Sequence, residues 1–156
     1  DGWESSTNAA SIAGSIDGLT SLTYLRVQGS NTLTGSIAGL TKLTYLCVSG
    51  SNTLSGDIGI NNMVNGITTL TLLGNNQMNT YTAGAVWSNA TVTINPAAGY
   101  GYDSTEIDNI LIDMANSAGG PSGKTIRLQG SSQPRTSASD AAVATLTGRG
   151  CTVITN

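Results

Sequence analysis

The chain has 156 residues, a length that suits one domain with a hydrophobic core. Only 10% of the residues are charged, histidine and phenylalanine are absent, and the formal net charge is -3. With six Lys and Arg in total and no basic cluster, we expect no nucleic-acid partner. The apolar runs are too short to span a bilayer, so we also expect no membrane insertion.

Two adjacent segments of 21 residues repeat one another. SIDGLTSLTYLRVQGSNTLTG (15–35) and SIAGLTKLTYLCVSGSNTLSG (36–56) are identical at 16 positions. A third copy, within 57–80, contains GITTLTLLGNNQM (66–78) and is offset by 24 residues, which predicts a three-residue insertion in the loop NNMVNG. Repeats of this length are typical of solenoids, in which each unit buries its apolar face against the next.

Each repeat contains the pattern of a short strand. In TYLRVQG, Leu25 and Val27 alternate with Tyr24 and Arg26, which is the period of a half-buried strand. Such strands are too short to be stable alone, so we expect them to stack in parallel. The stack would place three equivalent leucines in one dry interior: Leu25, Leu46 and Leu70.

The rest of each repeat predicts a turn and a back wall. We expect leucines of the first repeat to fill them: Leu19, Leu22 and Leu33. After each strand comes an asparagine whose amide is suited to satisfying backbone groups in a tight turn. These side chains would form a ladder along the solenoid: Asn31, Asn52 and Asn76.

The L-x-x-L-x-L spacing, followed by LTGSIAGL and LSGDIGI, resembles the leucine-rich repeat family over about residues 15–78. The asparagine lies one position later than the family's usual spacing. The resemblance implies an α/β right-handed leucine-rich repeat solenoid with a parallel sheet of short strands. We expect an irregular, turn-like back wall in the N-terminal half and two helices in the C-terminal half. Residues 1–156 then form one solenoid domain, with divergent helical repeats and a cap over 81–156.

The C-terminal half alternates strands with helices. ATVTIN (90–95) predicts a strand, and a helix follows with a capping-box pair, Asp103 and Glu106. The apolar stripe of this helix consists of Ile107, Ile110, Leu111 and Met114.

Beyond that helix, TIRLQGS (125–131) echoes YLRVQGS of the first repeat and predicts another strand. A shorter helix is expected over 138–147, capped by Ser137 together with Asp140, and CTVIT forms the last strand.

The tail that begins DNILIDMANS is similar to the C-terminal part of repeat proteins encoded by phages and found in metagenomic sequence. In that resemblance Cys151 takes the place of an aromatic residue, which implies a buried packing role. The resemblance also implies an extracellular, cell-surface or virion location.

The string AGGPSGKT (118–125) comes within one residue of a phosphate-binding loop. Such a loop needs a strand before it and a helix after it, so that a helix N-terminus faces the phosphates. Here the predicted helix comes first and the strand second. We therefore interpret the string as a helix-to-strand turn.

Catalytic chemistry has little support in the sequence. Without histidine, the commonest general base is missing. The remaining acids cluster on the predicted helix, where we expect them on the outer, solvated side: Asp103, Glu106, Asp108 and Asp113. We predict no enzyme activity, no catalytic residue, no metal site and no cofactor.

The two cysteines are not expected to form a disulfide. Cys47 lies at an outward strand position without activating cations or histidine, so we interpret it as an exposed thiol without a role. Cys151 faces inward on a distant coil.

The outward strand positions form three rows across the sheet. The first is Tyr24, Tyr45, Thr69, Thr91 and Thr125; the second is Arg26, Cys47, Thr71, Thr93 and Arg127; the third is Gln28, Ser49, Leu73, Asn95 and Gln129. Tyrosines and hydroxyls suit contacts with proteins or sugars, although threonine also simply favours strands. Our candidate ligand-binding residues are Tyr24, Arg26, Gln28, Tyr45, Ser49, Thr69, Thr71 and Arg127.

We therefore predict a non-enzymatic recognition and adhesion module that binds a protein or glycan through this face. The alternative is a purely structural spacer or decoration domain of a larger virion or surface protein. SIAGSIDG (11–18) has the pattern of a partial repeat, and the segment before it, with Trp3, is short for a cap. We thus expect the chain to belong to a larger polypeptide or assembly.

Overall fold

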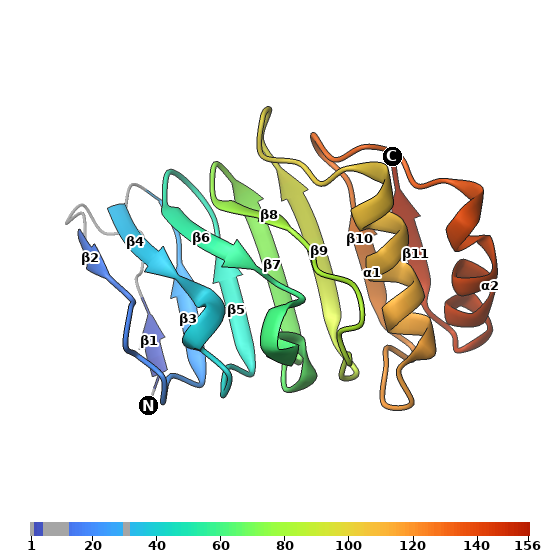
Figure 1. Cartoon of the computed structure of the whole chain (residues 1–156), viewed down its shortest axis with the longest axis horizontal. Helices are drawn as coiled ribbons and strands as arrows, with labels where there is room; N and C mark the ends of the chain where they lie inside the picture. The colour runs from blue at the N-terminus through green and yellow to red at the C-terminus, as the bar shows by residue number, and fades with distance from the viewer. Residues whose placement is uncertain (1, 5–12, 30–31) are drawn as a thin grey trace.

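The computed structural model of the chain describes residues 2–4, 13–29 and 32–156, and in this part the chain winds into a β-solenoid of parallel strands with two α-helices (Figure 1). One wall, which we call the front sheet, has seven parallel strands in the order β1-β3-β5-β7-β9-β10-β11. Their bounds are β1 Gly2–Glu4, β3 Tyr24–Val27, β5 Tyr45–Val48, β7 Thr69–Gly74, β9 Thr91–Pro96, β10 Thr125–Leu128 and β11 Thr152–Thr155.

The opposite wall, which we call the back layer, changes along the molecule (Figure 1). In the N-terminal half it is a second parallel sheet in the order β2-β4-β6-β8. In the C-terminal half, helices take the place of these strands between consecutive strands of the front sheet. The bounds are β2 Ala13–Ser15, β4 Thr32–Ser36, β6 Thr53–Asp57, β8 Gln77–Thr80, α1 Ser104–Asn116 and α2 Asp140–Gly148.

The second sheet corrects the expectation of an irregular back wall. Within TLTGS of β4, Leu33 is buried between exposed threonines, the same alternation that marks the front strands. Gly35 then adopts a φ of 107°, and a Cβ there would lie 2.8 Å from the Ser15 hydroxyl oxygen. The glycine therefore lets neighbouring coils approach closely while the chain turns toward the next coil.

Short 3-10 helices link the second sheet to the front sheet, and their lengths confirm the predicted insertion. The 3-10 helix η1 covers Ile37–Gly39, and its counterpart η2 in the next coil covers Ile60–Asn65. The three extra residues of the third repeat therefore extend this turn and leave the register of the front strands unchanged.

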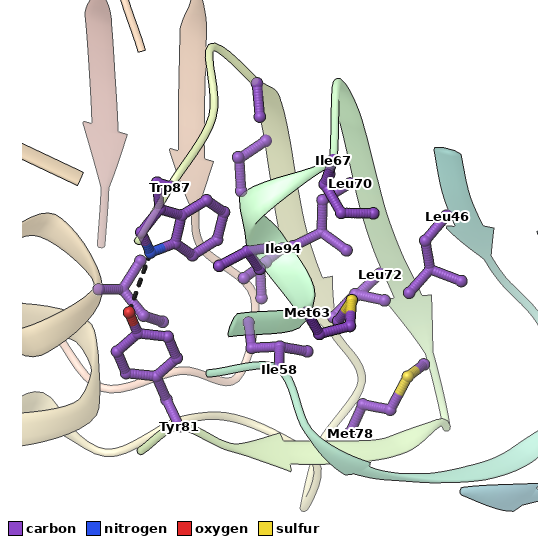
Figure 2. Close-up of a cluster of buried hydrophobic side chains, with 14 of the residues drawn as sticks. Leu46, Ile58, Met63, Ile67, Leu70, Leu72, Met78, Tyr81, Trp87 and Ile94 are labelled. Carbon is purple, nitrogen blue, oxygen red and sulfur yellow. Dashed lines mark hydrogen bonds between the residues drawn. The ribbon is translucent and has the colours of Figure 1, made fainter. Parts of the chain in front are cut away.

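The core lies between the two walls and confirms the predicted shared interior. Leu25 pairs in register with Leu46, and Leu46 with Leu70, and all three are at most 1% exposed. Figure 2 shows how side chains from both walls meet there. The labelled members of this buried cluster are Leu46, Ile58, Met63, Ile67, Leu70, Leu72, Met78, Tyr81, Trp87 and Ile94.

The back-wall leucines agree with the expectation at two positions of three. Leu22 and Leu33 are buried, but Leu19 is 46% exposed. Its counterpart one repeat later, Leu40, is 1% exposed. Leu19 lies between β2 and β3, close to the N-terminal end of the described stack. Leu40 lies in the equivalent turn one coil further into the stack.

The asparagine ladder is confirmed at the two positions that lie within the described residues. Asn52 and Asn76 are buried, and each Nδ2 donates to the carbonyl oxygen three residues earlier, that of Ser49 at 2.9 Å and that of Leu73 at 3.2 Å. Asn31 lies outside the described residues. The amides satisfy carbonyl groups at the turn after each front strand.

In the C-terminal half, the predicted strands and first helix are confirmed. Helix α1 begins after the predicted capping box, in which the Asp103 side chain accepts from the Glu106 N–H at 2.8 Å and Glu106 accepts from the Asp103 N–H at 2.9 Å. Its buried stripe contains Ile107, Ile110, Leu111 and Met114, as expected.

The start of the second helix differs from the prediction. Ser137 does not cap it, because the 3-10 helix η3, Ser137–Ser139, comes first and is capped by the Thr136 side chain. At the junction with α2, the Ser139 hydroxyl donates to Asp108 and forms no cap bond. The hydroxyls of Thr136 and Ser139 thus both donate to the Asp108 carboxylate of α1.

At the N-terminal end, part of the predicted partial repeat is a strand. Residues 13–15 form β2, which pairs with β4, and Trp3 lies in β1, which pairs with β3. Residues 11–12 lie outside the described part.

Neither of the described α-helices is long and apolar enough to cross a membrane.

Candidate binding face

One surface, which we call the strand face, consists of the outward positions of β3, β5, β7, β9, β10 and β11 and of the residues that directly follow β3, β5 and β10: Gln28, Ser49 and Gln129. The pairing of the strands confirms the first two predicted rows, and in the third row Leu73 pairs directly with Asn95. Tyr24, Tyr45, Thr69 and Thr91 pair in sequence along the first row. The second row pairs directly through Arg26, Cys47, Thr71, Thr93 and Arg127.

Two tyrosines stack at the N-terminal side of this face. The rings of Tyr24 and Tyr45 have centroids 4.3 Å apart and an interplanar angle of 10°. Both side chains are half-buried. Because the backbone register sets the rings against one another, the pair forms a rigid aromatic ridge that needs little ordering on binding.

The same arginine–glutamine arrangement occurs toward both ends of the front sheet. Arg26 Nη2 donates to Gln28 Oε1 at 3.0 Å, and Arg127 Nη1 donates to Gln129 Oε1 at 2.7 Å. Residues two apart on a strand share a face, so each glutamine fixes the guanidinium on the sheet surface. All four of these side chains are half-buried.

Rows of threonine lie between the two arginines. Thr69, Thr71, Thr91 and Thr93 are half-buried at outward positions of β7 and β9. In such a sheet, neighbouring hydroxyls are about 4.8 Å apart across the strands and about 6.6 Å apart along them. The result is a regular, uncharged array of hydroxyl and methyl groups.

Cys47 corrects the expectation of an exposed thiol. The register places it in the outward row, yet it is only 6% exposed. Its side chain is shorter than those of Arg26 and Gln28 beside it, and the Gln28 Nε2 donates to its Sγ at 3.8 Å. Both cysteines are free thiols, and Cys151 is buried as the phage-protein resemblance implies.

The acids of α1 also differ from the expectation of a solvated helix face. Asp108 is 4% exposed and accepts from the Thr136 N–H at 3.0 Å and from the Ser139 hydroxyl. Asp113 accepts from the Tyr81 hydroxyl at 2.7 Å and from the Gly84 and Ala85 N–H groups. These carboxylates hold loops whose backbone donors have no strand partner.

Glu106 has a similar second function, because it also accepts from the Tyr81 N–H at 3.0 Å. Among the four acids, Asp103 fits the prediction most closely, since it is exposed and caps the helix. The sequence signal that was missed is the long connection between β8 and β9. It contains no strand, so its backbone N–H groups need acceptors from elsewhere, and the carboxylates of α1 supply them.

Two pKa shifts support this view of the acids. Burial alone would raise the pKa of Asp108, but hydrogen bonds from Ser139 and Thr136 hold it below its ordinary value. Burial, together with Asp113, raises the pKa of Tyr81 well above its usual range, despite a hydrogen bond from the Trp87 Nε1–H. Figure 2 shows this last bond. Tyr81 therefore stays protonated and donates to Asp113.

The loop AGGPSGKT lies between α1 and β10, so the predicted order of helix and then strand is confirmed. Its polar groups contact neighbouring coils. The Ser122 N–H donates to Asn89 Oδ1 at 2.9 Å, and the Gly123 N–H donates to the Arg149 carbonyl at 3.0 Å. In the described part of the chain, no three His, Cys, Asp or Glu residues gather where a metal ion could be held.

The structure therefore defines a parallel β-solenoid with one regular outward sheet face. Comparison of the chain with protein-family models, with curated proteins and with solved structures finds no match. Of the predicted binding residues, the structure brings all eight onto the strand face: Tyr24, Arg26, Gln28, Tyr45, Ser49, Thr69, Thr71 and Arg127. The prediction missed the partner of Arg127, Gln129, although the repeated R-x-Q pattern of RVQ and RLQ could have identified it.

Proposed function

We propose that the protein is a non-enzymatic recognition and adhesion module of the right-handed leucine-rich repeat type, which binds a protein or glycan through the strand face. The observation that supports this best is the stacked pair Tyr24 and Tyr45, with the fixed Arg26–Gln28 pair beside it. Aromatic rings and a preoriented guanidinium offer large contact area and directional hydrogen bonds at low entropic cost.

In this proposal the module acts at a bacterial or virion surface, as part of a larger polypeptide or assembly. The similarity of the tail to phage-encoded repeat proteins supports that location. A rigid solenoid suits the role, because the sheet positions its outward residues before any ligand arrives.

The test compares the native protein with a Tyr24→Ala/Tyr45→Ala variant on a glycan array and in binding to bacterial cells. Tyr100→Ala is the matched control, because Tyr100 is also half-buried but lies in the loop after β9. We expect the double variant to lose binding while its circular dichroism spectrum stays native, and the control to bind normally. Unchanged binding by a folded double variant would favour the structural spacer or decoration domain instead.

A further inference from the structure

The charged side chains are divided between the two walls of the solenoid. Every acid whose side chain the structure describes belongs to the back layer or its loops: Asp17, Asp57, Asp103, Glu106, Asp108, Asp113 and Asp140. Two of the six cations lie on the other wall, and two more lie in turns next to it. Arg26 and Arg127 are on the strand face, and Lys42 and Lys124 are in the turns that lead into β5 and β10.

The two remaining cations are already used in the back layer. Arg135 forms an ion pair with Asp140, and the Arg149 guanidinium donates to carbonyl oxygens at the C-terminal end of α1, including that of Ala115 at 2.7 Å. Arg135 neutralises Asp140, and Arg149 caps the end of α1. Neither arginine contributes its charge to the strand face.

The strand face is therefore positive on a chain whose net charge is -3. From β3 to β11, its described outward positions carry two arginines and no acid. On β1, Glu4 pairs with Arg26 by backbone register. Arg127 lies four strands from Arg26 in the same row and is therefore the arginine further from this acid. Such a face complements an acidic ligand.

The separation of the two arginines limits the kind of acidic ligand. Arg26 and Arg127 share a row, and four strand spacings place them about 19 Å apart. Double-stranded DNA carries a charge about every 1.7 Å, far denser than this face can neutralise. The matching ligand carries widely spaced charges with neutral hydrogen-bonding groups between them.

The surface between the arginines fits neutral sugars. Within the described residues, the hydroxyls of Thr69, Thr71, Thr91 and Thr93 have no hydrogen-bond partner, so each can donate to and accept from a ligand. The strand spacing is close to the length of one hexose in a linear polysaccharide. A sugar chain that crosses the strands thus meets Thr69 and Thr71 at the sugar over β7, and Thr91 and Thr93 at the sugar over β9.

We propose that the strand face binds a linear acidic polysaccharide that runs across the strands. Its carboxylates lie on Arg26 and Arg127, each held in place by its glutamine, and neutral sugars cover the threonine rows. This inference rests on the proposed recognition function and names its ligand class.

The test measures binding of the intact protein by isothermal titration calorimetry. The acidic probes are hyaluronan and gellan oligosaccharides, in which neutral sugars separate the carboxylates, with a neutral N-acetylglucosamine oligomer and poly-glutamate for comparison. We expect at least one acidic oligosaccharide to bind, more weakly as salt rises, and at least tenfold more tightly than the neutral oligomer or the peptide. Arg26→Gln and Arg127→Gln should each weaken that binding about tenfold.

Arg135→Gln is the matched control, because it removes the same charge from the back layer. It should leave the affinity unchanged. Equal weakening by Arg135→Gln, equal binding of the neutral oligomer or of poly-glutamate, or no binding of any acidic oligosaccharide would each overturn the inference.

The same variants separate this inference from the proposed function. A ligand that is lost in Tyr24→Ala/Tyr45→Ala but binds Arg26→Gln/Arg127→Gln normally overturns the acidic-polysaccharide inference alone. If no ligand of the native protein is affected by any strand-face substitution, the proposed recognition function fails as well.

Discussion

The two halves of the solenoid are stabilised in different ways. From β3 to β8, equivalent residues recur in each coil, so leucine stacks on leucine and two parallel sheets enclose the core. From β9 onward, helices replace the second sheet, and single carboxylates such as Asp108 and Asp113 fix the connecting loops. The first half repeats the same apolar contacts from coil to coil, whereas the second half adds to its apolar core polar contacts that each occur once.

The two halves are therefore sensitive to different kinds of substitution. When one leucine in the repeated part is lost, the equivalent apolar contacts in the coils on both sides remain. Loss of a carboxylate in the helical part leaves several buried donors without an acceptor at once.

The largest effect is expected at the junction of the two halves. Trp87 is 1% exposed and its Nε1–H donates to the Tyr81 hydroxyl at 2.9 Å (Figure 2). Trp87→Ala should lower the free energy of unfolding by about 3–5 kcal/mol, because it leaves a cavity and removes the donor to the Tyr81 hydroxyl oxygen. Urea denaturation measures this. Tyr81→Phe, which keeps the ring, should cost only about 1–3 kcal/mol.

The next effect concerns Asp108 and depends on pH. Asp108→Asn should destabilise the protein by about 1–3 kcal/mol at neutral pH, because the amide cannot accept all the hydrogen bonds from Thr136 and Ser139.

The sign of its pH dependence follows from the lowered pKa. The stabilisation by Asp108 is fully present above its ordinary value of 3.8 and is lost as the pH falls through the lower pKa of the folded state. Urea midpoints of native protein and variant should therefore converge in acid. A constant difference down to the lowest pH would contradict this assignment.

A smaller effect is expected from the asparagine ladder of the repeated half. Asn52→Ala should cost about 1–2 kcal/mol, because the Ser49 carbonyl loses its donor in the turn after β5. Asn76→Ala should have a similar cost, since it makes the equivalent bond to Leu73. Thermal denaturation checks both, and a clearly unequal pair would mean that the two turns are not equivalent.

The smallest effect on stability is expected on the strand face. A double-mutant cycle of Tyr24→Ala and Tyr45→Ala should give a coupling of about 0.5–1.5 kcal/mol, as for other stacked aromatic pairs. Loss of binding without major loss of stability would separate the ligand-binding role of the face from its structural one. A coupling near zero would show that the rings do not stack in solution.

Much of the front sheet could be predicted from the sequence, because the repeat and its period-2 alternation fix both the strands and their register. The rows through Tyr24, Arg26 and their counterparts follow directly from the 21-residue offset. Helix α1 was also predictable, since its capping box and apolar stripe are local signals.

The second sheet and the acid contacts could not be derived in the same way. The TLTGS segment alternates over only a few residues and then bends at a glycine, so its pattern suggests a turn as much as a strand. The partners of Asp108 and Asp113 are about 28 to 32 residues away in sequence, and no short-range spacing reveals them. Burial of Cys47 depends likewise on the lengths of neighbouring side chains.

A single added cysteine tests the register of the front sheet. Thr71 pairs with Cys47, so the Cα atoms should lie about 4.8 Å apart, within the disulfide range of about 4.4–6.8 Å. Thr71→Cys should form a 47–71 disulfide under mild oxidation, which peptide mapping by mass spectrometry would detect. Thr69→Cys, which pairs with Tyr45, should leave Cys47 as a free thiol. A folded Thr71→Cys protein that stays reduced, or a disulfide between positions 47 and 69, would contradict the register and the rows that depend on it.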